Sequence, residues 1–117
     1  MTLAGKPAIS AVSVGGANWL RLARVEEVGL GQGRCFKVGC IQIAVFRPRD
    51  GELRAIGAVC PHRAGPLAQG IVGRDSVICP FHGYKFSLSD GRGLDNDLSV
   101  ASYRVHVRDD EIFVELR

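Results

Sequence analysis

Short apolar runs separated by turn residues dominate the chain from residue 19 onward. Several runs alternate apolar and polar positions with a period of two, which is typical of half-buried strands. No segment sustains the period of about 3.6 residues that marks a helix. The runs cover residues 19–25, 34–39, 40–47, 53–59, 76–79, 103–108 and 111–116. This pattern predicts an all-β domain built as a small antiparallel sandwich or barrel.

The run at residues 103–108 shows the alternation most clearly. Its Tyr and two Val residues fall on one face, and its two Arg residues and His106 fall on the other. We therefore expect a half-buried strand with His106 at the surface. Residues 49–51 and 109–110 lie between paired runs and are expected to form hairpin turns.

Composition and charge exclude several classes of function. The chain has 117 residues, enough for one domain with its own core, and its 15 glycines agree with many turns. The 15 basic and 12 acidic residues leave a net charge of only +3, and no basic run is present. Nothing in the charge pattern therefore indicates a nucleic-acid or membrane partner.

Residues 1–17 are small and weakly patterned, so we expect a loose tail before a domain that spans residues 18–117. Ser10 and Ser13 interrupt the apolar stretch that a secretory signal requires. No apolar run approaches the roughly 20 residues needed to cross a bilayer. We expect a cytoplasmic protein with reduced thiols, in which the four cysteines are better candidates for metal binding than for disulfides.

Two segments combine cysteine and histidine at short spacing. They are Cys60-x-His62 and Cys79-x-x-His82, and residues 63–78 separate them. Glycines and a proline between the segments allow two ligand-bearing loops to meet at one tip of a β-domain. Soft thiolates suit iron and sulfide, and imidazole suits iron as well. Two thiolates neutralise an oxidised 2Fe-2S core, whereas four leave it dianionic, so two neutral imidazoles raise the reduction potential.

A structural zinc site is the main alternative, since two Cys and two His are also a zinc ligand set. Zinc sites usually pair Cys with Cys and His with His, whereas each segment here mixes the two types. Mixed pairs favour a cluster whose two irons have different ligands. Four unrelated residues, two buried thiols and two surface imidazoles, are a further alternative that the adjacent Pro and Gly residues make weaker.

The spacing C-x-H-x16-C-x-x-H resembles that of the Rieske family, and the resemblance covers about residues 19–117. It implies a Rieske-type fold that binds one 2Fe-2S cluster at one tip. Cys60 and Cys79 would hold the inner iron, and His62 and His82 the outer, more exposed iron. The exposed histidines would be the place where electrons enter and leave. A partner would dock at the same tip, and the loop at residues 91–101 would close over the third side of the cluster.

Departures from the respiratory branch of that family imply a low reduction potential. Respiratory members carry a disulfide between the loops, and a Ser and a Tyr hydroxyl that donate to the cluster sulfurs. Here Phe81 stands at the second-loop cysteine position, Tyr84 replaces the Ser and Phe86 replaces the Tyr. Losing donors to the cluster destabilises the added electron. We expect a potential near the low end of the Rieske range, about −150 mV, with Tyr84 shielding the cluster or gating partner contact.

Among low-potential members, the stretches 60–72, 79–94 and 102–116 resemble the small subunit of assimilatory NAD(P)H nitrite reductase. That resemblance implies a large flavin and siroheme subunit as redox partner. A Rieske ferredoxin that feeds a ring-hydroxylating dioxygenase, together with its reductase, is the alternative. No general base, nucleophile or substrate pocket is identifiable, so we expect an electron-transfer subunit or carrier. An oxygenase would need a further iron domain, for which no chain remains.

Two other cysteines, Cys35 and Cys40, lie in apolar runs on either side of a glycine turn. Cysteine is commonly buried as a small hydrophobic residue. We therefore expect both to be core residues and not a second metal or redox site.

Overall fold

The computed structural model describes residues 11–14, 17–49, 52–61, 64–81 and 83–116. Within these ranges the chain forms eleven strands, two short 3-10 helices and three antiparallel sheets. The first sheet has the order β1 (Ala11–Val14), β2 (Ala17–Arg24), β11 (Glu111–Leu116), β10 (Val105–Arg108). No helix in the described part of the chain is long and apolar enough to cross a membrane.

The second and third sheets complete the architecture. The second has the order β3 (Gln32–Val38), β4 (Ile41–Arg47), β5 (Arg54–Gly57), β9 (Ser102–Tyr103). The third has the order β6 (Ile71–Val72), β7 (Ser76–Ile78), β8 (Lys85–Ser87). The 3-10 helices are η2 (Val25–Glu27) and η3 (Leu67–Gln69). The all-β antiparallel class expected from the sequence is therefore confirmed.

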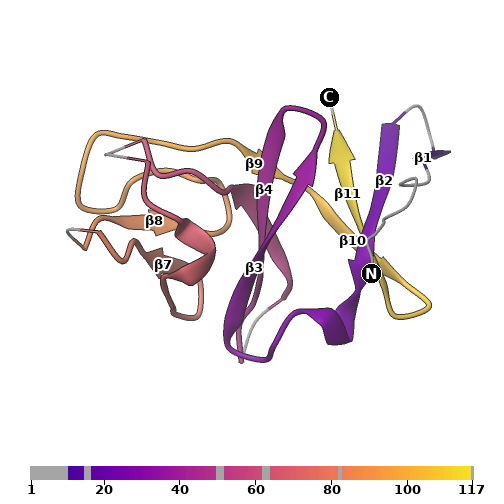
Figure 1. The fold of residues 1–117 in the computed structure, drawn as a ribbon, viewed down its shortest axis with the longest axis horizontal. Coiled ribbons are helices and arrows are strands. Elements are labelled where there is room, and N and C mark those ends of the chain that lie inside the picture. The colour runs from indigo at the N-terminus through magenta and orange to yellow at the C-terminus, as the bar shows by residue number, and fades with distance from the viewer. Residues whose placement is uncertain (1–10, 15–16, 50–51, 62–63, 82, 117) are drawn as a thin grey trace.

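The second sheet is the middle layer of the molecule. In Figure 1, β3 and β4 stand between β7 and β8 on one side and β2 and β11 on the other. Strand β4 is buried on both faces, because Ile43 and Val45 join one apolar cluster while Ala44 and Phe46 join the other. All four are fully buried. A strand that is covered on both faces carries consecutive apolar residues and does not alternate. Residues 43–46, within the run at 40–47, show this pattern.

Each apolar cluster belongs to one side of the middle sheet. The base cluster, which joins the first and second sheets, contains Leu20, Val28, Ile43, Val45, Ala55, Ile112 and Val114. The loop-side cluster, which joins the second and third sheets, contains Ala44, Phe46, Ile56, Ala58, Cys60, Leu67, Val77, Cys79, Phe86 and Leu88. The two cysteines of the predicted site therefore lie in the core between the second and third sheets.

The run at residues 103–108 differs from a single half-buried strand. It is divided at Arg104 into β9, which pairs with β5, and β10, which pairs with β11. The chain thus crosses from the second sheet to the first within one apolar run. Val107 is 43% exposed, against expectation, whereas His106 is exposed as expected.

Two further expectations concern turns and the N-terminal tail. Asp109 and Asp110 form the predicted turn between β10 and β11, both with left-handed backbone (φ 53° and 63°). Such a pair matches the twist of an antiparallel hairpin. The turn expected at 49–51 lies partly outside the described residues. The segment 1–17, expected to be a loose tail, contains β1, which pairs with β2.

A matched pair of isoleucines tests this division of the core. Ile112 is fully buried in the base cluster, whereas Ile41 is 41% exposed at the start of β4. We expect Ile112→Ala to lower the free energy of unfolding by about 2–5 kcal/mol through lost burial and a residual cavity. Ile41→Ala should change it by about 0.5 kcal/mol or less. Guanidinium unfolding at equal iron content measures both, and equal losses would contradict the assignment.

Candidate metal centre

The two Cys/His segments form loops, and each loop is closed by a backbone hydrogen bond of the same type. The backbone N–H of Cys60 donates to the carbonyl of Gly65 at 2.9 Å, and that of Cys79 donates to the carbonyl of Tyr84 at 2.7 Å. In both loops the acceptor lies five residues after the cysteine. The two loops therefore have the same backbone hydrogen-bonding pattern.

The match extends to the backbone conformation. The residue before each acceptor is left-handed, with φ 54° at Ala64 and φ 73° at Gly83. This conformation suits glycine and costs about 1–2 kcal/mol for a residue with a Cβ atom. Ala64 thus adopts it against its intrinsic preference, and the closed shape of the first loop is maintained by its surroundings.

Different elements carry the two loops. The first loop leaves β5 and returns to η3, where Val59 bridges Pro66 and the Leu67 N–H donates to the Ala58 carbonyl at 3.0 Å. The second loop is the connection of the hairpin between β7 and β8, in which Ile78 pairs with Lys85. Each loop is therefore anchored at its base by paired backbone.

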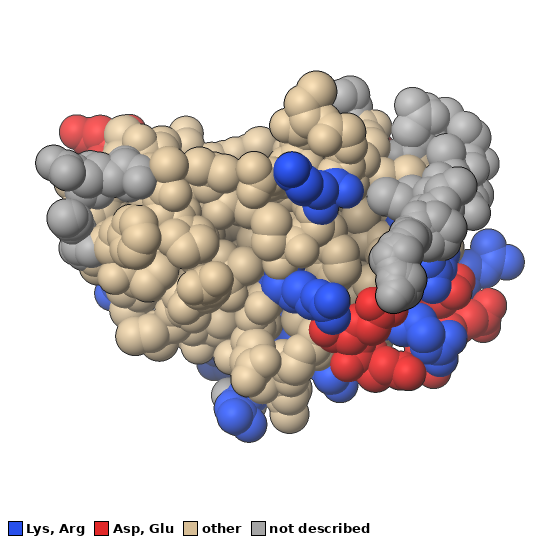
Figure 2. All heavy atoms as spheres, viewed as in Figure 1, with Lys and Arg blue, Asp and Glu red and all other residues tan. Residues whose placement is uncertain are grey.

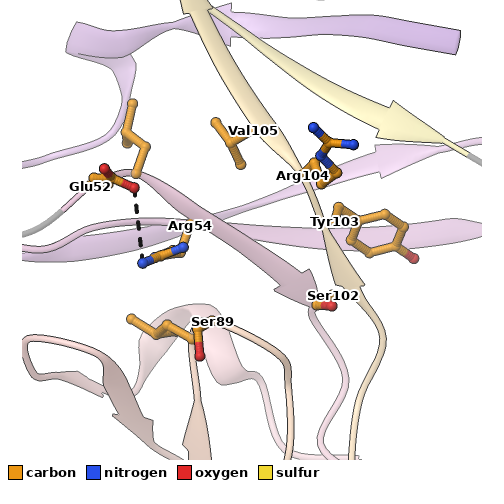
Figure 3. Close-up of a pocket in the computed structure, with 9 residues that line it drawn as sticks. Glu52, Arg54, Ser89, Ser102, Tyr103, Arg104 and Val105 are labelled. Atoms are coloured by element: carbon orange, nitrogen blue, oxygen red, sulfur yellow. Dashed lines mark ion pairs between the residues drawn. The ribbon is translucent and has the colours of Figure 1, made fainter. Parts of the chain in front are cut away.

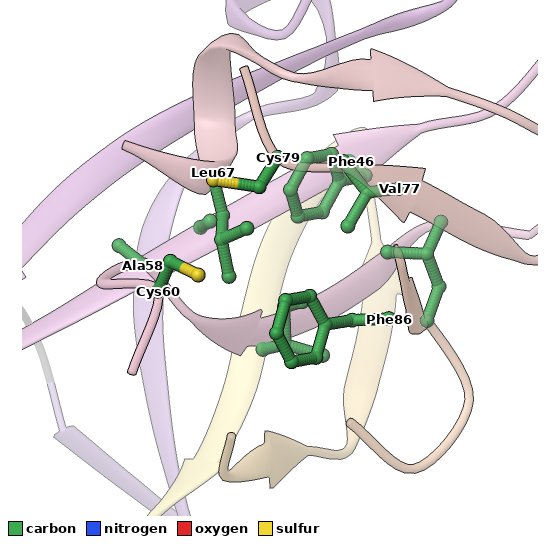
Figure 4. Close-up of a cluster of buried hydrophobic side chains, with 10 residues drawn as sticks. Phe46, Ala58, Cys60, Leu67, Val77, Cys79 and Phe86 are labelled. Atoms are coloured by element: carbon green, nitrogen blue, oxygen red, sulfur yellow. The ribbon is translucent and has the colours of Figure 1, made fainter. Parts of the chain in front are cut away.

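Both loop cysteines point into the loop-side cluster. Cys60 is fully buried and Cys79 is 1% exposed. Figure 4 shows the two thiols on the same side of this cluster, near Leu67. The sulfur of Cys79 accepts a hydrogen bond from the backbone N–H of Phe81 at 3.4 Å. This backbone bond fixes the position of the Cys79 sulfur relative to its own loop.

The two loops touch each other at the first loop's glycine. A Cβ atom placed on Gly65 would lie 2.6 Å from the Cys79 sulfur, closer than real Cβ atoms approach. The thiol of one loop therefore rests against the backbone of the other. Two buried thiolates on touching loops fit a single iron–sulfur group held by both loops.

The predicted histidine ligands, His62 and His82, lie outside the described residues. Within the described part, no three His, Cys, Asp or Glu side chains gather into a metal site. The structure thus brings Cys60 and Cys79 into one apolar cluster, and the assignment of all four ligands stays a prediction. The residues next to each histidine, Pro61 and Phe81, are exposed.

The segment at residues 91–101 packs on the same side as the loops. Leu98 and Val100 lie against the loop-side cluster. The Lys85 N–H donates to the Asp95 carboxylate at 3.0 Å and holds the pKa of that carboxyl below its usual range. This ties the segment to β8, the strand that follows the second loop.

The two residues expected to replace hydroxyl donors, Tyr84 and Phe86, both lie at the loop-side cluster. Phe86 is fully buried in the same cluster as the two thiols, and Tyr84 is half-buried and packs against it. A phenylalanine ring offers no hydrogen-bond donor. A backbone group, the N–H of Phe81, donates to the sulfur of Cys79.

The expectation that Cys35 and Cys40 are core residues is wrong, since both are exposed. Cys35 pairs with Ala44 of β4, so it lies on the loop side of the sheet. Because β3 is the edge strand of that sheet, Cys35 lies beyond the packed cluster. Cys40 belongs to the turn between β3 and β4. An apolar run does not reveal whether its strand will be central or at an edge, which is why the sequence misled here.

Two of the hollows on the described surface bear on the location of the site. One, of about 380 Å³, borders the first loop and is lined in part by Cys35, Gln42, Val59, Ala64 and Gly65. The other, of about 230 Å³, has a polar lining that includes Arg54, Ser102 and Tyr103 (Figure 3). Of the described ligand candidates, neither Cys60 nor Cys79 belongs to its lining, and Arg54 there faces Glu52 at 3.9 Å.

Comparison with known proteins gives a family match over most of the chain. Residues 18–115 match the family described as Rieske-like [2Fe-2S] domain. A curated relative, cholesterol 7-desaturase nvd 2 from Ciona intestinalis, is 38% identical over 79 residues, which cover 66% of this chain and 18% of the relative. The chain spans less than a fifth of the length of the curated relatives it matches first.

Two solved structures of similar size share the fold. A protein described as an NADH-dependent nitrite reductase small subunit from Mycobacterium tuberculosis has a TM-score of 0.78 and 28% identity, covering 86% of this chain and 96% of that one. The ferredoxin of carbazole 1,9a-dioxygenase from Nocardioides aromaticivorans has a TM-score of 0.75 and 27% identity, covering 85% of this chain and 98% of that one.

The thiol beside the first loop gives a prediction about pH. Cys35 is exposed, but neighbouring atoms take part of the water from its thiol, and this desolvation raises its pKa. The nearby Lys37 cation lowers the pKa by less. The protonated form is therefore favoured, and alkylation of Cys35 should rise with pH through a midpoint above that of an ordinary thiol. The rate of iodoacetamide labelling, followed by mass spectrometry in a Cys40→Ser variant, measures it. Lys37→Gln should raise the midpoint further, and a midpoint below that of an unstructured cysteine peptide would contradict the prediction.

Proposed function

The chain belongs to the Rieske-like [2Fe-2S] domain family, and we propose that Cys60, His62, Cys79 and His82 hold its cluster. As a Rieske-type domain it transfers electrons, and its cofactor is a 2Fe-2S cluster. When bound, such a cluster takes up and releases one electron at a time. The residues of this chain supply binding, burial and the tuning of the potential.

The observation that carries the ligand assignment is the pair of matched, touching loops. Each loop presents one buried thiol from a cysteine whose N–H is bonded five residues ahead. The thiols share one apolar cluster, where water is excluded and charge interactions are strong. In both loops the predicted histidine follows within three residues of the cysteine.

Burial differs between the two ends of the proposed site. The cysteines are buried, whereas Pro61 and Ala64 of the first loop and Phe81 and Gly83 of the second are exposed. These four residues flank the two histidines in the sequence. We infer that the imidazole end faces the surface, so that His62 and His82 are the groups through which electrons enter and leave.

The surface around the loops favours an apolar contact. In Figure 2 the Lys, Arg, Asp and Glu side chains gather mainly at the end that holds β2 and β10, while the face over β7 and β8 carries few. Phe81 and Val59 are both more than 40% exposed beside the loops. A redox partner that docks there would bury a small area that includes these apolar side chains, and transient electron-transfer complexes bury small areas.

The partner that we propose is the flavin and siroheme large subunit of a cytoplasmic NAD(P)H nitrite reductase. Support comes from the similarity to a nitrite reductase small subunit, which this chain matches over nearly the whole length of that subunit. The alternative role, a ferredoxin for a ring-hydroxylating dioxygenase, has support of similar weight from the carbazole dioxygenase ferredoxin. Both roles use the same electron-transfer site.

The ligand assignment predicts a mixed-ligand iron–sulfur spectrum. The purified protein should hold iron and sulfide, absorb visible light and give a reduced-state electron spin resonance signal of Cys/His ligation. Its potential should lie near −150 mV, the low end of the Rieske range. His82→Cys should lower that potential, because an added thiolate makes the site more negative. His106→Ala, a change at an exposed residue of β10, should leave the spectrum and potential unchanged.

One result would count against the ligand assignment, and another would count against the expected low potential. Bound zinc without visible absorption would replace the cluster with a structural metal site. A potential well above zero would contradict the inferred loss of hydroxyl donors to the cluster.

The proposed partner predicts electron transfer in a reconstituted system. With a flavin and siroheme nitrite reductase large subunit, this chain should increase nitrite-dependent NAD(P)H oxidation several-fold. A Cys60→Ser variant should abolish this gain, with the large subunit alone as the baseline. Reduction of a dioxygenase terminal component in place of this gain would favour the ferredoxin role.

A further inference from the structure

Gly65 of the first loop lies against two different groups of the second loop. A Cβ atom at this position would lie 2.6 Å from the Cys79 sulfur, and 3.2 Å and 3.3 Å from the Cδ2 and Cγ atoms of the Phe81 ring. The ring and the sulfur therefore both rest on the bare backbone of Gly65. Only glycine leaves room for this double contact without displacing the sulfur.

Hydrogen bonds connect the same residues to both cysteines. The Gly65 carbonyl accepts from the N–H of Cys60, and the N–H of Phe81 donates to the sulfur of Cys79. Gly65 is thus bonded to the cysteine of its own loop while it contacts the cysteine of the other. Phe81 is bonded to its own cysteine while its ring covers the other loop.

The exposure of Phe81 is unusual for a residue with these contacts. Its side chain is 46% exposed, although a phenylalanine gains free energy from full burial. The inner edge of the ring is the part that meets Gly65 next to the buried sulfur. The ring is therefore placed between solvent and the point where the two loops touch.

We propose that the Phe81 ring on Gly65 is a non-covalent clasp that keeps the two ligand loops together and keeps water from the Cys79 thiolate. Phe81 is then a positioning residue for the cluster, since it acts on a ligand and not on the iron. This inference rests on the proposed ligand role of Cys60 and Cys79. It assigns to Phe81 a function in the isolated protein, beyond any contact with a redox partner.

The clasp can be tested on the cluster-loaded protein with Phe81→Ala and Phe81→Leu. The alanine variant loses the cover, whereas leucine retains apolar bulk over Gly65. We expect Phe81→Ala to lose the visible absorption of the cluster about tenfold faster in excess chelator, the scale on which groups that support a metal ligand act. Phe81→Leu should stay within about twofold of the wild type. Ile71→Ala, at a 69% exposed residue of β6, is the matched surface control.

A second pair of variants tests the glycine side of the clasp. Gly65→Ala should speed cluster loss, because the new methyl group must displace the Cys79 sulfur or the Phe81 ring. Gly57→Ala is its control, since a Cβ atom there would lie 3.6 Å from the nearest atom, on Val100, an ordinary contact. The Phe81 pair decides the question even if Gly65→Ala assembles no cluster.

The reduction potential separates a positioning role from a general loss of stability. Water that reaches the Cys79 thiolate stabilises the added negative charge. The potential of Phe81→Ala should therefore rise, while that of Phe81→Leu and both controls stays at the wild-type value. Far-UV circular dichroism of Phe81→Ala, Phe81→Leu and the two controls, Ile71→Ala and Gly57→Ala, should match that of the wild type.

The results have distinct meanings for the two proposals. If the wild type shows the mixed-ligand spectrum and Phe81→Ala retains both its cluster lifetime and its potential, the clasp is wrong and the ligand assignment stands. If the wild type lacks that spectrum, the ligand assignment fails and the clasp fails with it. Faster loss in Phe81→Ala with rescue in Phe81→Leu supports the clasp.

Discussion

The structure depends on a sheet that is buried on both of its faces. Strand β4 supplies Ile43 and Val45 to one apolar cluster and Ala44 and Phe46 to the other. Each cluster alone is small, with seven buried residues in the base cluster and ten in the loop-side cluster. Because the middle sheet forms one wall of both clusters, one cluster joins β2 and β11 to this sheet while the other carries the thiols.

On the loop side, burial and local hydrogen bonding share the task of building the site. The apolar cluster fixes where Cys60 and Cys79 point, and the bonds from their N–H groups fix the shape of each loop. Gly65 joins the two loops through a contact that requires the absence of a side chain. The positions of the two thiols are therefore supported by apolar packing, by backbone bonds and by the contact at Gly65.

The sequence predicted this arrangement in its broad features because the signals were local. Strands β4 and β11 follow from apolar runs, and the two Cys/His segments are recognisable from spacing alone. The matched closure of the two loops was not predictable, since it depends on backbone angles at Ala64 as well as Gly83. A left-handed alanine has no signature in a sequence.

Features that depend on long-range neighbours were missed or misread. Cys35 was expected in the core, but β3 is an edge strand and leaves it exposed. Val107 alternates correctly within its run, but the run changes sheets at Arg104, so its partner surface is different. In each case the local pattern was present, but the exposure of the side chain depends on strands from other parts of the chain.

The anchoring of both loops in a close-packed core has a consequence for the speed of electron transfer. Packed interiors resist compression, and groups held by them shift little when a nearby charge changes. The sulfurs of Cys60 and Cys79 lie in such an interior, each on a loop closed by its own backbone bond. We therefore expect a small reorganisation energy on the protein side of the site. The rate would then depend on distance and driving force, with little contribution from motion of the loops.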